Sequence, residues 1–290
     1  MSMPSFSKVN ILNDFHRSLE DVVAGIVAEH STPKEKAQKV NALVNGVKTA
    51  LAPQLLQFSD KERTEPALVL QYCYTVASLE YRHKVWPYEY MTFSRRIGEL
   101  WEAFCSTAWD FPKQTDVKRI APPDFDKVRS ALMKRLRNNV GKHEKREEIL
   151  EDVNTFVNIV GEINMVEDEV FTVKGIPHVI DFKSGFGSNE KGNMLRLQTV
   201  GRAYRIWNNE TRLLLLVRQD DNNNYLKVLR KSDLWSVYTG DAAYQQITEI
   251  TGANMAQVRH DIINWESDLT PQFLQYLKNQ PTDLTSYLAW

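Results

Sequence analysis

Apolar residues recur at helical spacing along the first half of the chain. Pro33 suits the first turn of a helix, with Thr32 or Ser31 as its cap. The apolar residues that follow are three or four positions apart: Val40, Leu43, Val44, Val47 and Leu51. The same analysis predicts helices at about residues 34–56, 66–83, 92–109 and 125–138. The polar, proline-containing stretch at residues 110–126 predicts a loop.

In the second half the pattern changes to one typical of strands. Runs rich in β-branched and aromatic residues predict strands at residues 156–160, 170–173, 178–183, 213–217 and 225–229. A tight turn at residues 222–224 precedes the last of these. We expect helices at about residues 193–207 and from residue 242 onward. This order predicts an α/β fold, a mixed central β-sheet flanked by helices, with a helical N-terminal part.

The best candidate for a domain boundary is the loop at residues 110–126. We expect residues 1–110 to form a helical region that packs on a core at residues 111–290. That core would hold the mixed sheet and the C-terminal helices, and the two parts would form one continuous domain.

The composition is that of a soluble globular protein of 290 residues, with 42% hydrophobic and 25% charged residues. We find no apolar run long enough for a membrane span and no secretory signal pattern, so we expect a cytoplasmic protein. Cys73 and Cys105 suit buried apolar positions in a reducing compartment. No paired Cys/His spacing suggests zinc, and no phosphate-binding loop suggests a nucleotide cofactor. The net charge of −1 argues only weakly against DNA binding, because a basic groove and an acidic site can cancel.

The most informative segment is residues 167–185. If residues 178–183 form a strand, Asp181 and Lys183 share one face, and His178 lies on the opposite, core-facing side. A hairpin with residues 168–173 would bring Asp168 close to Asp181. Carboxylates are the ligands that Mg²⁺ prefers, and two acids with one lysine are the minimum for metal-assisted phosphodiester hydrolysis. A simpler interpretation is a surface hairpin in which Asp181 and Lys183 form a solvated pair.

The segment resembles the PD-(D/E)xK nuclease superfamily, and type II restriction endonucleases within it. Asp181-Phe182-Lys183 matches the (D/E)xK tripeptide, and Asp168 fits the acid that precedes it. The departure is Glu167, which stands where the family has proline. Glu162, in the sequence Gly-Glu-Ile-Asn, is a competing first acid, although we favour Asp168. In this family a helix before the sheet often supplies one further acid. Here that acid would be Glu102, or else Glu99.

The resemblance implies a Mg²⁺-dependent, sequence-specific endonuclease that cleaves double-stranded DNA and leaves 5′-phosphates. Asp181 would bind Mg²⁺ together with Asp168, or with Glu162 in place of Asp168, and Glu102 would support them. Lys183 would position the attacking water. A two-fold homodimer would match a palindromic site. The glycine-rich loop after the tripeptide and the start of the next helix would contact DNA through Ser184, Ser188, Asn189, Lys191, Asn193 and Arg196.

Two other functions stay open. One is a repair or recombination nuclease of the same superfamily that selects branched or damaged DNA. The other is a non-catalytic DNA-binding protein that keeps a degenerate site. The basic stretch at residues 134–146 either lines a DNA groove or is a solvated face. Gln198 and Tyr204 lie either near the site or on an ordinary packing helix.

Overall fold

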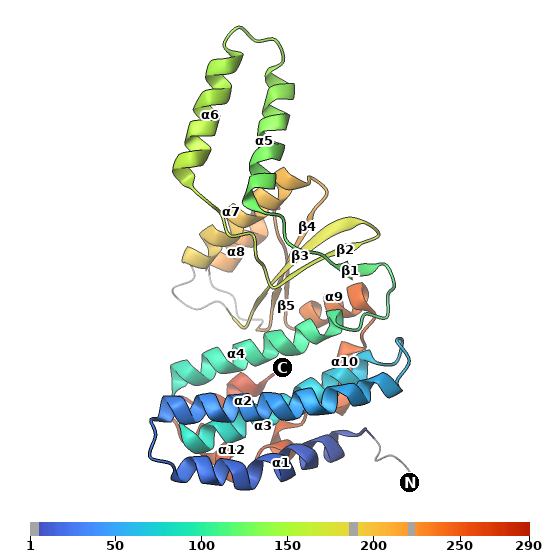
Figure 1. Cartoon of the computed structure of the whole chain (residues 1–290), viewed down its shortest axis with the longest axis vertical. Helices are drawn as coiled ribbons and strands as arrows, with labels where there is room; N and C mark the ends of the chain where they lie inside the picture. Colours follow the sequence, from blue (N-terminus) through green and yellow to red (C-terminus); the bar gives the residue numbers. More distant parts are fainter. Residues whose placement is uncertain (1–5, 186–190, 220–223) are drawn as a thin grey trace. The chain divides into compact units, whose positions relative to one another are not determined.

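The computed structural model describes residues 6–185, 191–219 and 224–290 (Figure 1). These residues form an α/β protein in which helices accompany a five-stranded mixed sheet, as predicted. The chain divides into two compact units. The first contains the chain up to Thr115 and again from Tyr244, and the second contains Asp116–Ala243. None of the helices in the described part combines the length and the apolarity that a membrane crossing needs.

All the regular elements among the described residues of the first unit are helices. Its N-terminal part contains α1 Lys8–Ala28, α2 Pro33–Leu51, η1 Ala52–Gln57, α3 Thr64–Val85, α4 Tyr90–Ser106 and η2 Thr107–Trp109. Its C-terminal part contains α9 Asp241–Thr251, whose first residues still belong to the second unit, and then α10 Met255–Asp261, α11 Trp265–Asp268, α12 Pro271–Lys278 and η3 Leu284–Leu288.

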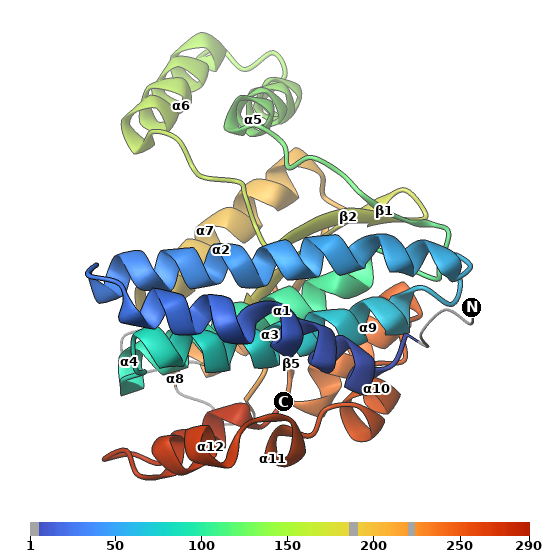
Figure 2. The ribbon, with the colours of Figure 1, turned by 60° about the horizontal axis from the view of Figure 1, so that its bottom comes forward.

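Helix α3 forms the centre of the first unit because apolar residues surround it. Tyr72, Cys73 and Ser78 are completely buried although they lie on different sides of the helix. Helices α1 and α2 pack on α3 and on each other (Figure 2). The start of α2 is the predicted one: Pro33 occupies its first turn, and Thr32 and Glu35 form a reciprocal capping box.

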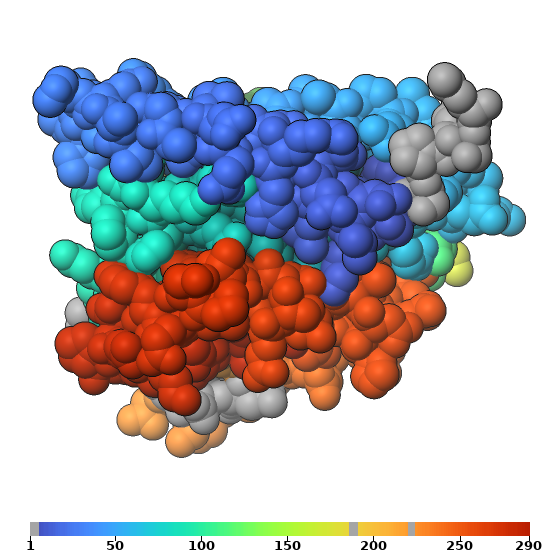
Figure 3. All heavy atoms as spheres, turned by 90° about the horizontal axis from the view of Figure 1, so that it is seen from below, coloured from blue at the N-terminus to red at the C-terminus, as the bar shows by residue number. Residues whose placement is uncertain are grey.

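The chain returns to the first unit at its C-terminal end. Figure 3 shows the C-terminal segments, in orange and red, beside the N-terminal helices in blue and teal. Asp268 accepts hydrogen bonds from Lys8 Nζ and from Tyr72 OH, each at 2.8 Å. Tyr276 OH donates to the carbonyl of Tyr88 at 2.8 Å. This arrangement differs from the predicted division, which placed the C-terminal helices with the sheet. The sequence shows that these segments are helical, but their packing partners are set by long-range contacts.

The second unit contains the sheet. Its strands are β1 Val117–Arg119, β2 Glu169–Val173, β3 Ile176–Lys183, β4 Arg212–Val217 and β5 Ser236–Thr239, and they lie side by side in that order. The β1–β2 and β2–β3 pairs are antiparallel, whereas β3–β4 and β4–β5 are parallel. The helices of this unit are α5 Phe125–Val140, α6 Arg146–Val160, α7 Lys191–Trp207 and α8 Asn224–Lys231.

The core of the second unit lies between the sheet and α7. Val179, Leu213 and Leu215 from the central strands join Leu197 and Val200 of α7 in one apolar cluster. Helix α5 packs on α7, and α6 packs on α5 to form a helical hairpin (Figures 1 and 2). The strands β3 and β4 are buried almost along their whole length, which is usual for parallel strands in the middle of a sheet.

Two predicted strands are wrong. Residues 156–160 belong to α6, where Leu150, Val153 and Val157 recur at helical spacing, so the longer period outweighs the β-branched composition. Residues 225–229 belong to α8, in which Leu226 and Leu229, three positions apart, are both fully buried. Residues 222 and 223 of the predicted turn lie outside the described residues. Strands β1 and β5 were not predicted, because they have only three and four residues.

Candidate active site

A tight hairpin places the candidate residues at one end of β3. Lys174 and Gly175 form the two-residue turn, with φ values of 51° and 81°. This left-handed backbone is the one that such hairpin turns need, and glycine adopts it at little cost. The register pairs Glu169 with Ile180, so Asp168, just before β2, lies beside Asp181. The predicted hairpin and the predicted proximity of Asp168 and Asp181 are therefore confirmed.

Asp181 lies at the centre of an ion network and is only 1% exposed. One of its carboxylate oxygens, Oδ1, is ion-paired with Lys183 Nζ, and the other, Oδ2, accepts a hydrogen bond from Arg196 Nη2. Lys183 also donates to the carbonyl of Phe182 at 3.0 Å. The solvated surface pair that we considered from the sequence is therefore wrong, because Asp181 is buried and has two cationic partners.

Glu167 is the third acid of the network, and its side chain is fully buried. Its Oε1 accepts a hydrogen bond from Arg196 Nη1 at 2.6 Å, so one guanidinium bridges Glu167 and Asp181. Burial, followed by the hydrogen bond with Asp181 and its negative charge, raises the pKa of Glu167 to about 8. Glu167 is therefore a carboxyl group whose ionisation is disfavoured unless a further positive charge is supplied.

Asp168 is solvent-exposed as a residue, but its carboxylate is turned toward β3. Its Oδ2 accepts a hydrogen bond from the backbone N–H of Phe182 at 2.6 Å. Partial desolvation of the carboxylate, followed by the charge of Asp181, raises the pKa of Asp168 to about 6. The hydrogen bond from Phe182 lowers the pKa because it favours the ionised form, but burial and the charge of Asp181 together raise the pKa by more.

The donor atoms of this network fit a hard divalent cation. Glu167 Oε2 and Asp181 Oδ1 are buried and find no hydrogen-bond donor with suitable geometry. Such carboxylate oxygens are the ligands that Mg²⁺ prefers. As they lie, however, no three Asp, Glu, His or Cys side chains among the described residues converge on one metal position. The reason is local: the cation of Arg196 already pairs with both Glu167 and Asp181, and Lys183 is held against Asp181.

Several predicted residues lie outside this network. Glu162 is exposed just after α6 and lines a hollow with Asp124 and Asn164. Glu102 lies on α4 in the first unit, so its support of the site stays a prediction. Tyr204 is a packing residue, because it is fully buried and its OH donates to the carbonyl of Met165. His178 is buried on the other side of β3, as predicted, and it stacks on Phe171.

The predicted DNA-contacting residues have different positions. Ser184 accepts hydrogen bonds from the guanidinium of Arg218, Nε at 3.1 Å and Nη2 at 2.9 Å. Lys191 is exposed and Asn193 half-buried, both in the first turn of α7. Ser188 and Asn189 lie outside the described residues. Arg196, which we predicted at the DNA backbone, bridges two carboxylates. Any contact of these residues with DNA stays a prediction.

Sequence reasoning missed the roles of Glu167 and Arg196. Glu167 was seen only as the residue that replaces the family proline, although its position next to Asp168 was a usable signal. The role of Arg196 depends on how α7 packs on the sheet.

Comparisons with family models, with curated proteins and with solved structures found no match.

Proposed function

We propose that this protein is a Mg²⁺-dependent endonuclease that hydrolyses phosphodiester bonds in double-stranded DNA at a specific sequence. The observation that supports this most is the group of three carboxylates, Glu167, Asp168 and Asp181, beside Lys183 at the carboxyl end of a parallel strand. Ligands of open α/β sheets bind at that end of the strands. Glu167 Oε2 is buried without a donor, and Asp181 Oδ1 has only its ion pair with Lys183, so a bound cation would compensate both oxygens.

Each residue has a role that its contacts suggest. Asp181, Asp168 and Glu167 would hold the ion, which when bound polarises the phosphate and lowers the pKa of a coordinated water. Lys183 is ion-paired with Asp181 and would hold the attacking water or a phosphate oxygen beside it. Burial excludes bulk water from Asp181 and so strengthens the electrostatic interactions of the network. The expected products carry 5′-phosphates, by analogy with restriction enzymes.

A second candidate function is non-catalytic DNA binding, and one observation favours it. Arg196 and Lys183 together compensate Glu167 and Asp181 with positive charges from the chain itself. A site of this kind serves as a structural ion network without a metal. The distinction between the two functions is whether a divalent ion enters the network.

The test is cleavage of phage DNA by the purified protein with and without Mg²⁺. We expect discrete fragments that require both Mg²⁺ and Lys183, and Lys183→Ala should be inactive. Lys174→Ala, in the hairpin turn, is the matched control and should retain activity. Absence of cleavage on several linear and branched DNAs, with binding retained, would favour the non-catalytic function. Cleavage of branched DNA alone would identify a structure-selective nuclease of the same chemistry.

A further inference from the structure

Helix α6 exposes a row of large apolar side chains. Phe156 is 65% exposed, Ile159 77% and Val160 52%. Within its unit α6 packs mainly on α5, so most of its surface has no other cover. Single exposed apolar residues are ordinary, but three within one helical turn and a half are not.

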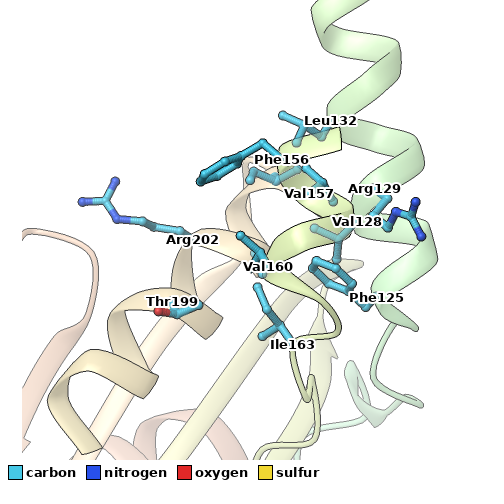
Figure 4. Close-up of a pocket in the computed structure, with 12 residues that line it drawn as sticks. Phe125, Val128, Arg129, Leu132, Phe156, Val157, Val160, Ile163, Thr199 and Arg202 are labelled. Carbon is cyan, nitrogen blue, oxygen red and sulfur yellow. The ribbon is translucent and has the colours of Figure 1, made fainter. Parts of the chain in front are cut away.

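The row continues into an apolar hollow of about 240 Å³ between α5, α6 and α7. Figure 4 shows Phe125 and Leu132 of α5 on one side of this hollow, and Phe156 and Val160 of α6 on the other. Thr199 and Arg202 of α7 lie along its edge. A hollow of this size with almost purely apolar walls is poorly suited to water, so filling it with apolar side chains would be favourable.

The two helices of the hairpin carry opposite charges. Helix α5 has five basic residues and one acidic residue, a net charge of +4. Helix α6 has four acidic residues and one basic residue, a net charge of −3. Among the described residues, no ion pair joins the two helices: the pairs of Arg129, Lys145 and Arg146 are all with acids up to three positions away. The opposite charges of α5 and α6 are therefore largely unused within one chain.

We infer that the α5–α6 hairpin is a self-association surface and that its occupant is the hairpin of a second copy of this chain. A two-fold axis along the hairpin places α5 of each copy against α6 of the other. The basic end of α5, at Lys134, Arg135 and Arg137, then meets the acidic start of α6, at Glu147, Glu148 and Glu151. At the other end of the hairpin, where α6 ends, the apolar row of Phe156, Ile159 and Val160 in one copy covers the same row in the other. The product is a four-helix bundle with alternating charge.

The charge pattern favours a second copy over a nucleic acid as the occupant. A DNA backbone would meet the acidic surface of α6 as closely as the basic surface of α5, and it would leave Phe156 and Ile159 in water. A self-complementary hairpin satisfies both the charges and the apolar row. The inference uses no residue of the candidate active site, so its failure would leave the proposed function standing.

The test is sedimentation velocity of the full chain over concentrations of roughly 1–100 µM, a range suited to interfaces of modest size. We expect a concentration-dependent dimer. Phe156→Glu with Ile159→Glu should raise its dissociation constant at least about tenfold, since apolar residues at an interface core carry most of the affinity. Leu56→Glu is the matched control, because Leu56 is a similarly exposed apolar residue in the first unit, and it should leave the dimer unchanged.

A mixing experiment tests the pairing of α5 with α6 directly. One variant reverses α5 (Lys134→Glu, Arg135→Glu, Arg137→Glu), and the other reverses α6 (Glu147→Lys, Glu148→Lys, Glu151→Lys). Each alone should be a monomer with a native circular dichroism spectrum, and an equimolar mixture should form a heterodimer. The inference is overturned if the wild type stays monomeric throughout, or if its dimer survives the glutamates on α6. Protection of the hairpin by DNA in a monomeric wild type would overturn it in favour of a nucleic-acid partner.

Discussion

Replacing Glu167 with glutamine should remove most of the pH dependence of stability between pH 6 and 8. The structure raises the pKa of Glu167 from 4.5 to about 8 through burial and the neighbouring Asp181. Below pH 4.5 the carboxyl is protonated in both the folded and the unfolded state. Between 4.5 and 8 the folded state binds more protons, so the free energy of unfolding falls as the pH rises.

The magnitude follows from the size of this shift. At about 1.4 kcal/mol for each pH unit, the rise to about 8 corresponds to a loss of at most about 5 kcal/mol across the window. Asp168 also makes the free energy of unfolding fall as the pH rises, but its pKa is about 6, so this fall ends near pH 6. The decline between pH 6 and 8 therefore belongs mainly to Glu167. Glutamine keeps an acceptor for Arg196 but carries no charge, so Glu167→Gln should flatten this part of the curve.

The assay is urea unfolding at several pH values between about 5 and 8, with tryptophan fluorescence as the signal. Trp235 is a suitable reporter, because it is buried in the apolar cluster of the same unit. Glu162→Gln, at an exposed glutamate, should keep the wild-type slope. At pH 8, Mg²⁺ should stabilise the wild type more than Glu167→Gln, since binding adds to folded-state stability. A wild type whose stability is constant or rises from pH 6 to 8 would refute the reasoning.

Further substitutions test separate parts of the structure. Arg196→Gln should lower the stability by roughly 1–3 kcal/mol, since it leaves buried carboxylates less compensated. It should also tighten Mn²⁺ binding in calorimetry, because it removes a cation that already pairs with both carboxylates. Weaker Mn²⁺ binding would contradict this. Tyr204→Phe leaves the buried Met165 carbonyl without its donor and should cost about 1–3 kcal/mol in urea unfolding. Gly175→Val should cost at least about 1 kcal/mol, because its φ is 81°, visible as a lower melting temperature. Gly46→Ala lies in the interior of α2 with open space around the added methyl group and should instead stabilise by about 0.5–1 kcal/mol.

Local patterns were enough to predict the hairpin that carries the candidate site. Residues 176–183 follow a tight turn, and the spacing of Asp168, Asp181 and Lys183 then requires them to meet, whatever surrounds the sheet. The helices of the first unit were predictable for the same reason: caps and apolar spacing are properties of neighbouring residues.

Burial and partners could not be predicted, because they depend on packing between distant segments. The face of β3 that carries Asp181 is covered, and this is what turns Glu167 and Arg196 into partners of Asp181. The α6 segment shows the converse case. Its last five residues, 156–160, have strand composition, but they continue a helix whose apolar spacing begins six residues earlier at Leu150.

The return of the C-terminal helices to the first unit makes the second unit an insertion. The chain leaves the first unit after Thr115 and comes back at Tyr244. Near the point of departure, the backbone N–H groups of Lys113 and Gln114 both donate to the carbonyl of Thr251, at 2.8 and 3.2 Å. The outgoing and returning segments are thus fastened to each other on the side of the first unit. Two covalent connections that share one anchor tie the inserted unit to the first, so a single break in either connection would leave the two units joined.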